Sequence, residues 1–325
     1  MIRRRSLLAS AAAGLGAPLV GAAPAAPAAK PLLPQLRIYI PGGAGGGWDQ
    51  TGRTLGATMQ ALGLVEKVEY ENKGGKGGTL GLADFVARFD KDPAALLVGG
   101  MVMVGALAIG DSKVSLSQVT PLARLTNDYL AVCTLPGSPY TDLRALVTRL
   151  REQPASVAFT GGSLGSVDHM LVGMMLRHLQ QDVAKLQYLP GTSAKESIAM
   201  MDAGKAQVLI AGLGEVKADL ASKRLLPLGV SARRALRGIP ALSSAGVPLE
   251  LANWRGVFGP ANAPAPARTL LQDLVQRTAE SVLWNDTLKE HDWFPALAVG
   301  DAFRQALEID QSIATVVAHM LKLRA

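Results

Sequence analysis

The chain has 325 residues, 49% hydrophobic and 18% charged, which is enough for about two domains with buried cores and excludes a mainly disordered chain. Its single cysteine, Cys133, excludes an internal disulfide and a cysteine-based zinc site. The net charge of +7 includes three arginines in the first five residues, and the remaining excess is too small and too scattered for a nucleic-acid surface.

The first 29 residues have the pattern of a signal peptide. Three arginines at residues 3–5 precede an uncharged apolar segment at residues 7–21, and an alanine- and proline-rich stretch follows at residues 22–29. The arginine run is compatible with the general secretory route or the twin-arginine route. We therefore expect residues 1–29 to be a signal peptide and the remainder to be exported.

A repeating unit of apolar strand, glycine loop and helix begins directly after this leader. The first strand is expected at residues 36–40 and its loop at residues 41–48, and Asp49 is expected to cap the following helix. The next strand is expected at residues 68–72 and its loop at residues 73–78, again before a helix. Strands that alternate with helices predict a largely parallel sheet.

An uncharged run at residues 93–110 allows two interpretations. Its length is at the lower limit for a membrane-spanning helix, and glycine is tolerated in such helices. However, four glycines interrupt the run, and residues 96–98 form an apolar segment directly before a glycine pair. We prefer a buried parallel strand that leads into a loop and a short helix.

The second half of the chain follows the same plan and then becomes helical. Strands are expected at residues 157–159, 186–189 and 207–211, each followed by a glycine-containing loop. After Pro260 we expect helices only. The pattern predicts an α/β protein of two lobes, each a mostly parallel sheet flanked by helices, with a ligand site between the lobes.

Five loops follow expected strands and either are rich in glycine or open a helix. They lie at residues 41–49, 73–79, 99–105, 160–166 and 190–193. Open α/β sheets bind ligands at the carboxyl ends of their strands, and free N–H groups at helix starts favour anions. The loops predict an anion-binding cleft, although tight turns alone also account for the glycines. The Walker A and G-x-G-x-x-G patterns do not fit, which argues against nucleotide phosphates.

Ser163 offers an alternative of a different class. Residues 161–165 match the G-x-S-x-G pattern of a hydrolase nucleophile, and Asp286 with His291 or His319 follows in the order that hydrolases use. Against this, the helix is expected to begin three residues after the serine, and no oxyanion segment precedes it. The other interpretation is that Ser163 donates its hydroxyl to a bound anion.

His169 is the histidine best placed for a role in the cleft. It adjoins Asp168 at the start of a helix that faces the expected cleft, so it is positioned to donate to a carboxylate or else to pack there. The four histidines lack metal-binding spacing and have no cysteine partner. We expect no metal ion and no other cofactor.

Eight short segments stand out by their order along nearly the whole chain after the leader. They lie at residues 41–49, 71–72, 77–81, 103–105, 120–125, 168–169, 214–215 and 253–258. Together they resemble the substrate receptors of tripartite tricarboxylate transporters, also called Bug receptors. The loop that ends Gly-Gly-Gly-Trp-Asp is similar to the tricarboxylate branch of that family rather than to its amino-acid branch.

The resemblance implies an exported receptor with the two-lobed, type II-like clamshell fold of periplasmic binding proteins. Such a receptor closes on a small carboxylate, a di- or tricarboxylate such as citrate, and delivers it to membrane permease subunits without catalysis. We expect a monomer whose first lobe comprises residues 30–128 and 252–325, and whose second lobe comprises residues 129–251. A sensor receptor for a signalling partner would have the same cleft and stays open as an alternative.

The resemblance also implies which residues hold the carboxylate, mainly through backbone N–H groups and bridging waters. By this resemblance, the ligand-binding residues of the first lobe are Gly46, Gly47, Asp49, Gly78 and Thr79. Those of the second lobe are Gly162, Ser163 and Asp168. From the same loops we add Gly45, Trp48, Gly77, Gly161, His169 and Thr192. Asp49 is either a ligand contact through a water or only the helix cap, since an ionised aspartate repels an anion.

Two departures from the family pattern fall at the expected cleft. Residues 191–195 read Gly-Thr-Ser-Ala-Lys, where the tricarboxylate branch usually has a glycine triplet followed by glutamate. Ser166 and Val167 replace a Gly-Thr pair that is common before the Asp-His dipeptide. The receptor role is unaffected, but the identity of the carboxylate stays open.

Overall fold

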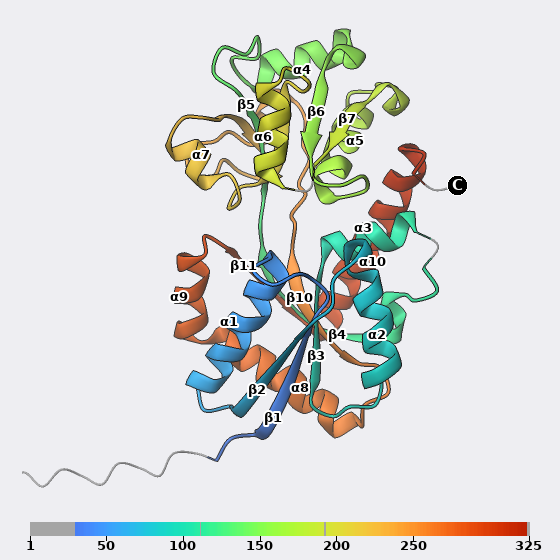
Figure 1. The fold of residues 1–325 in the computed structure, drawn as a ribbon, viewed down its shortest axis with the longest axis vertical. Coiled ribbons are helices and arrows are strands. Elements are labelled where there is room, and N and C mark those ends of the chain that lie inside the picture. The colour runs from blue at the N-terminus through green and yellow to red at the C-terminus, as the bar shows by residue number, and fades with distance from the viewer. Residues whose placement is uncertain (1–29, 111, 192, 324–325) are drawn as a thin grey trace, which may run out of the picture.

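Two α/β lobes lie one above the other in the computed structural model, joined by two chain crossings (Figure 1). The structure describes residues 30–110, 112–191 and 193–323. The expected signal peptide at residues 1–29 and the expected site residue Thr192 therefore lie outside the described residues. The two-lobed α/β architecture predicted from the sequence is confirmed.

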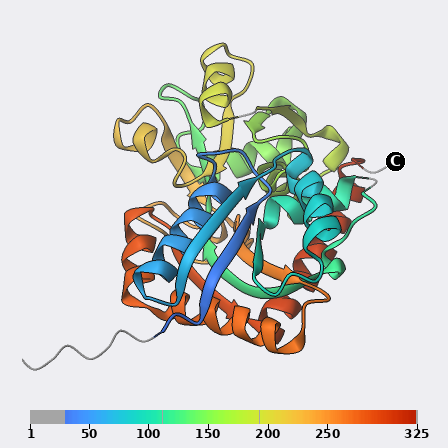
Figure 2. The same cartoon turned by 60° about the horizontal axis from the view of Figure 1, so that its bottom comes forward.

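The lower lobe contains a six-stranded sheet in the order β11-β4-β10-β3-β1-β2. Its elements are β1 (Leu33–Ile40), α1 (Gly47–Ala61), β2 (Val65–Asn72), a 3-10 turn η1 (Lys76–Gly78), α2 (Thr79–Phe89), β3 (Ala95–Gly100), α3 (Met101–Ile109), η2 (Leu116–Gln118), β4 (Val119–Asn127), β10 (Arg255–Pro260), α8 (Ala265–Glu280), α9 (Val282–Glu290), β11 (Phe294–Val299) and α10 (Gly300–Met320). Helices cover both faces, with α1, α8 and α9 on one and α2, α3 and α10 on the other (Figures 1 and 2).

The upper lobe contains a five-stranded sheet in the order β7-β6-β8-β5-β9. Its elements are β5 (Leu130–Thr134), α4 (Leu143–Glu152), η3 (Pro154–Ser156), β6 (Ala158–Gly161), α5 (Val167–His178), η4 (Val183–Lys185), β7 (Gln187–Pro190), α6 (Ala194–Asp202), β8 (Val208–Gly212), α7 (Lys217–Ala221), β9 (Leu226–Val230) and η5 (Leu242–Ala245). Helix α5 begins directly after Ser166, whose hydroxyl accepts the N–H of His169, as predicted from the sequence.

Both sheets are mixed, so the prediction of mostly parallel sheets is wrong in this respect. In the lower sheet β10 is antiparallel to β3 and β4, and β11 is antiparallel to β4. In the upper sheet β5 is antiparallel to β8 and β9. Strands β5 and β10 each enter their lobe directly after a chain crossing from the other lobe. They therefore run away from the lobe boundary, whereas the strands on either side of them run toward it. The expectation of helices only after Pro260 is also wrong, because β11 follows α9.

Residues 93–110 form β3 and α3 rather than a single long helix, as preferred from the sequence. Within the described ranges, no helix combines the length and the apolar character that crossing a membrane requires. Strand β3 is buried along its whole length, which explains its continuous apolar sequence. The structure therefore supports the buried-strand interpretation of this run.

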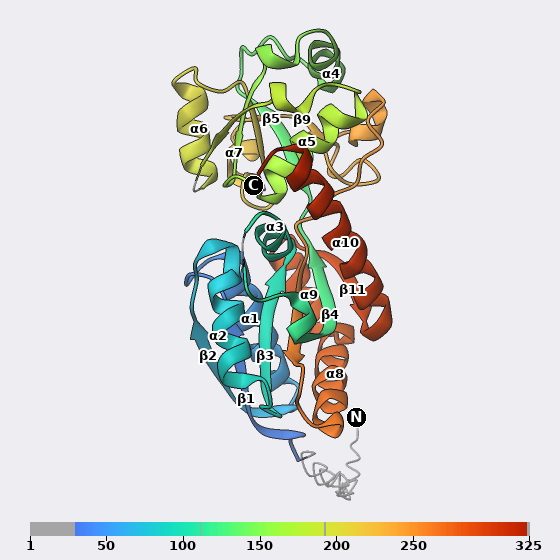
Figure 3. The same cartoon turned by 90° about the vertical axis from the view of Figure 1, so that its right-hand side faces the viewer.

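Helix α10 links the lobes independently of the two chain crossings. It starts against the lower sheet and ends beside α5 of the upper lobe (Figure 3). There the guanidinium of Arg177 donates to Sδ of Met320 at 2.7 Å, and Leu321 packs against Gly173. One apolar core cluster accordingly includes residues of both lobes.

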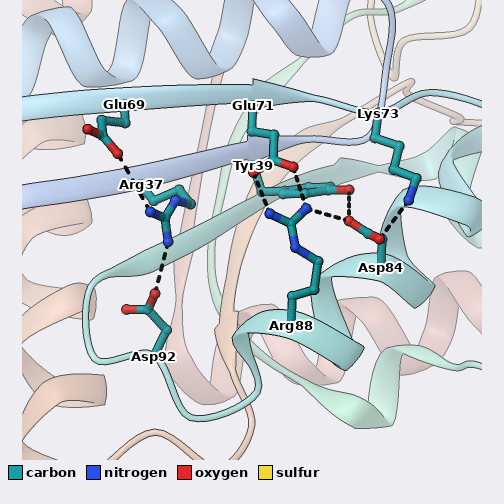
Figure 4. Close-up of polar contacts among 8 residues, drawn as sticks. All are labelled: Arg37, Tyr39, Glu69, Glu71, Lys73, Asp84, Arg88 and Asp92. Atoms are coloured by element: carbon teal, nitrogen blue, oxygen red, sulfur yellow. Dashed lines mark hydrogen bonds and ion pairs between the residues drawn. The ribbon is translucent and has the colours of Figure 1, made fainter.

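A network of ion pairs fixes α2 against the edge of the lower sheet. Asp84 of α2 accepts hydrogen bonds from Tyr39 at 2.7 Å, from Lys73 at 2.6 Å and from Arg88 at 2.8 Å, and Arg88 also pairs with Glu71. These bonds, led by the one from Lys73, hold the pKa of Asp84 well below its usual range. Figure 4 shows this network and, beside it, a separate group in which Arg37 forms ion pairs with Glu69 and Asp92. The charges compensate one another, so the network positions the helix whose first residues reach the lobe boundary.

Candidate ligand-binding cleft

Strands β1, β2 and β3 end at the lobe boundary from below, and β6, β7 and β8 end there from above (Figure 1). Three adjoining cavities are lined by the residues that follow these strands. We call them the lower cavity, of about 210 Å³, the upper cavity, of about 620 Å³, and the side cavity, of about 670 Å³. Val102 of α3 lines all three. The expected glycine loops thus meet at one cleft.

The loop after β1 forms the floor of the lower cavity. Gly46, Gly47 and Trp48 line this cavity, together with two earlier glycines of the same loop. Helix α1 begins at Gly47, and no side chain caps it, so its first N–H groups are free of intrahelical partners. The positive end of α1 therefore lies at the cavity wall, where it favours a negatively charged ligand.

Asp49 braces this loop from behind and is not the helix cap that was predicted. It lies in the first turn of α1, where its carboxylate accepts the N–H of Gly45 at 2.8 Å and side-chain bonds from Arg53 at 2.8 Å and Asn72 at 2.9 Å. Burial would raise the pKa of Asp49, but these hydrogen bonds outweigh it and lower the pKa. Neither Asp49 nor Gly45 lines any of the three cavities.

Trp48 connects the first glycine loop to the second. Gly78 has a φ of 90°, and a Cβ atom there would lie 2.6 Å from the indole ring of Trp48, so only glycine fits. Gly77 and Thr79 line the side cavity, whereas Gly78 lines none of the three. The hydroxyl of Thr79 donates to the carbonyl of Lys76 at 3.0 Å, which closes the turn before α2.

The loop after β6 forms one wall of the upper cavity. Gly161, Gly162, Ser163 and Asp168 all line this cavity. The carboxylate of Asp168 accepts the N–H of Gly162 at 2.8 Å, so Asp168 holds the loop in place while it faces the cavity. Burial, with a smaller contribution from the nearby charge of Glu215, raises the pKa of Asp168 to about 7.

His169 packs behind this loop and lines none of the three cavities. Its Nδ1 accepts the N–H of Gly165 at 3.1 Å, and its ring stacks on Tyr188 with the centroids 4.3 Å apart. Burial lowers the pKa of His169 to about 4, so the ring is neutral at pH 7. The structure thus gives His169 the packing role that the sequence left open.

Ser163 does not have the surroundings of a hydrolase nucleophile. Its side chain is exposed, and within the described ranges no histidine is hydrogen-bonded to it. Nδ1 of His169 accepts a hydrogen bond from the N–H of Gly165. Asp286 forms an ion pair with Lys289, and His291 stacks on Trp293. The serine lies in the loop four residues before α5 rather than on a sharp strand-to-helix turn. Its position in the walls of two cavities fits a hydroxyl donor better.

Arg255 is the main residue that the sequence analysis missed. It starts β10, is 6% exposed and lines the lower cavity. Its Nη2 lies 3.4 Å from Oδ2 of Asp128, which is 3% exposed, while its buried Nη1 has no hydrogen-bond partner. A Cβ atom on Gly47 would lie 2.8 Å from Nη2, so the guanidinium packs directly on the start of α1. A buried donor without a partner is the arrangement expected where a ligand binds.

Glu215 and Asn253 complete the junction between the lower and upper cavities, since both line each of them. Oδ1 of Asn253 is buried without a partner. Burial raises the pKa of Glu215 and of Asp128, because Arg255 offsets their desolvation only in part. Glu215, Asn253 and Arg255 lie in segments 214–215 and 253–258. Both segments were part of the family resemblance, but their residues were not predicted as site residues.

Comparisons with known proteins identify the family and the fold of the chain. The sequence profile of the family "Tripartite tricarboxylate transporter family receptor" matches residues 54–305. A UPF0065 protein from the tcbD-tcbE intergenic region of Pseudomonas sp. (strain P51) is 24% identical over 233 residues, which cover 69% of this chain and 68% of that protein. Its function is not part of that description.

Two solved structures with bound ligands share the fold. MatC from Rhodopseudomonas palustris, with bound malate, has 20% identity and a TM-score of 0.66, with 90% of this chain and 99% of that chain covered. Rpa4515 from R. palustris, with adipate, has 19% identity and a TM-score of 0.72, with 89% and 97% covered. At these identities the likeness establishes the fold alone.

Proposed function

We propose that this chain, which belongs to the tripartite tricarboxylate transporter receptor family, captures a small carboxylate between its two lobes and presents it to the permease subunits of such a transporter. Receptors of this family are periplasmic, and we propose that the leader at residues 1–29 exports this one as a monomer. The two bodies that close would be residues 30–128 with 252–325 and residues 129–251, since the sheets divide between β4 and β5 and again before β10.

The observation that carries the proposal is the set of unused donors at the lower cavity. The free N–H groups at the start of α1 and the guanidinium of Arg255 come from different elements and meet at Gly47, and Nη1 of that guanidinium has no hydrogen-bond partner. Oriented N–H groups and a guanidinium are the donors that recognise a carboxylate, and the guanidinium is the stronger because it is charged. We assign one carboxylate group of the ligand to this position.

The acidic residues of the cleft do not contradict an anionic ligand. Asp128 is paired with Arg255, and the raised pKa values of Glu215 and Asp168 favour their neutral forms more than is usual for carboxyls. A protonated carboxyl donates a hydrogen bond to a carboxylate instead of repelling it. The proposed ligand class is therefore a di- or tricarboxylate, of which malate and adipate, the ligands named for the two structural relatives, are the first candidates and citrate the next.

The test is a ligand panel on the chain from Lys30 onward, unfolded and refolded first to remove any ligand carried through purification. Thermal midpoints would be measured with mono-, di- and tricarboxylates and then titrated by calorimetry. A ligand at 100 times its Kd stabilises the folded chain by about 2.7 kcal/mol, which raises the midpoint measurably. A rise with one carboxylate class is expected. No rise with any carboxylate, from a chain that has refolded, would refute the proposal.

A further inference from the structure

The side cavity is part of the same cleft but differs from the other two cavities in its lining. It lies between the starts of α2 and α3 below and the loop at residues 163–166 above. It shares Val102 with both other cavities, and Ser163 and Ser166 with the upper cavity. The side cavity therefore adjoins both other cavities at Val102.

Most of the wall of the side cavity is apolar. Val102, Ala106 and Ile109 follow one another at helical spacing along one face of α3 and line the cavity together. Leu80 from the lower lobe and Leu164 from the upper lobe also line it, although they are 46% and 48% exposed to water. Two exposed leucines on opposite lobes around one cavity indicate an apolar occupant.

The charged side chains among the described lining residues are both cationic. They are Lys76, on the turn before α2, and Lys113, after α3. Neither forms an ion pair with a described residue, and no described acidic residue lines this cavity. An anionic group at the far end of an occupant would be paired by these lysines.

The walls of the side cavity are already in contact across the lobe boundary. A Cβ atom on Gly105 of α3 would lie 2.7 Å from the carbonyl oxygen of Gly165, and one on Gly165 would lie 2.6 Å from Cδ1 of Ile109. The α3 face and the upper loop therefore touch along one edge. The cavity is a formed feature of this conformation and not only open space between separated lobes.

We propose that the side cavity is the subsite for the body of an elongated ligand, and that the receptor prefers a straight-chain dicarboxylate of about eight carbons in total. The stripe from Val102 to Ile109 is about 10 Å long, at ~1.5 Å per helical residue. A zigzag chain with ~1.5 Å bonds advances about 1.3 Å per carbon, so about eight carbons follow the stripe. One carboxylate would lie at Arg255 and the other near Lys76. This inference rests on the proposed function and makes it more specific.

The experiment is a calorimetric titration of the refolded chain with straight-chain dicarboxylates of four, six, eight and ten carbons. Each methylene group buried in an apolar site tightens binding by up to about fourfold. We expect the eight-carbon acid, suberate, to bind at least tenfold more tightly than succinate. Octanoate, which has the same length but one carboxylate, is expected to bind several-fold more weakly than suberate, because it lacks the group that pairs with Lys76.

Two tryptophan substitutions separate the subsite from general effects. Ala83→Trp fills the side cavity from α2, and Ala57→Trp adds the same side chain to the exposed face of α1, away from the cleft. A83W should remove the dependence of affinity on chain length, whereas A57W should keep the wild-type series. Lys76→Ala, which adds no bulk, should reduce the preference for suberate over octanoate, and it serves as the second test if A83W does not fold.

The outcomes distinguish this inference from the proposed function. Equal or falling affinity from four to eight carbons, or an A83W series like that of the wild type, would overturn the side-cavity subsite while a carboxylate receptor remained. No binding of any acid in this series or of any carboxylate in the earlier panel, by a chain that has refolded, would overturn the proposed function itself. A K76A variant with an unchanged preference for suberate would overturn the position of the second carboxylate.

Discussion

Replacing Arg255 by methionine should strongly destabilise the fold, by an amount that depends on pH. The guanidinium lies 3.4 Å from Asp128, and the two residues are 6% and 3% exposed. Removing one partner of a buried pair leaves an uncompensated buried charge, which costs about 3–5 kcal/mol. Without the arginine, the folded-state pKa of Asp128, already raised by burial, rises further above its unfolded value. In R255M, the stability that depends on Asp128 is retained below the unfolded-state pKa of this residue and is lost as the pH rises through its folded-state pKa. The loss of stability relative to the wild type is therefore larger at pH 8 than at pH 5.

Urea unfolding at pH 8 and at pH 5 measures this deficit. Arg233→Met is the matched control, because Arg233 pairs with Glu250 at 3.2 Å but its side chain is 83% exposed, so its loss should cost about 0.5 kcal/mol or less. Adding Asp128→Asn to R255M should recover part of the stability, since no buried charge is then left unpaired. A loss under about 1 kcal/mol for R255M at pH 8, or an equal loss at both pH values, would show that the pair is not buried as described.

Three further predictions use the loops of the cleft. Gly78→Ala brings a Cβ within 2.6 Å of Trp48 at a φ of 90° and should cost about 1–3 kcal/mol more than Gly63→Ala, where φ is 67° and nothing lies within 4 Å; equal urea midpoints would contradict this. Asp168→Asn should raise the thermal midpoint more at pH 8 than at pH 5, because the folded pKa of about 7 makes wild-type stability fall as the pH rises from the unfolded pKa to about 7. The same substitution should make dicarboxylate affinity less dependent on pH in that range. Ser163→Ala should weaken ligand binding by less than about tenfold. Ester hydrolysis should stay at the rate of buffer alone in the wild type and in S163A. An esterase activity of the wild type that S163A abolishes would restore the hydrolase alternative.

The parts of the fold that local sequence determines were predictable. Residues 36–40 and 68–72 were predicted as strands that lead into glycine loops, and both are strands in the structure. The start of α5 was predictable from Ser166, because a serine cap acts on N–H groups only two or three residues away. Gly63 and Gly204 end helices at positive φ, which is again a local requirement.

The errors arise where partners are distant in sequence. Asp49 looks like a helix cap, but Asn72, on the neighbouring strand, fixes its carboxylate in the loop instead. Strands β5 and β10 are antiparallel to their neighbours because each follows a lobe crossing, which strand and helix periodicity does not encode. Arg255 looks like an isolated cation at the start of an apolar strand until Asp128, 127 positions earlier, is placed beside it.

If the lobes close on the ligand as proposed, the position of the Arg255–Asp128 pair would connect ligand capture to that closure. Asp128 follows β4 and Arg255 begins β10, so the two residues lie on the two strands that leave and re-enter the lower lobe. Between them, the backbones of Asp128 and Asn253 exchange hydrogen bonds of 3.3 and 2.8 Å. A carboxylate that binds Nη1 of Arg255 therefore acts on the crossing itself, and its charge compensates the guanidinium where the lobes pivot. If that is the coupling, R255M should weaken ligand binding and also remove the ligand-induced decrease in radius of gyration measured by small-angle X-ray scattering at saturating ligand. A variant that binds weakly but still becomes as compact as the wild type when saturated would limit Arg255 to ligand binding alone.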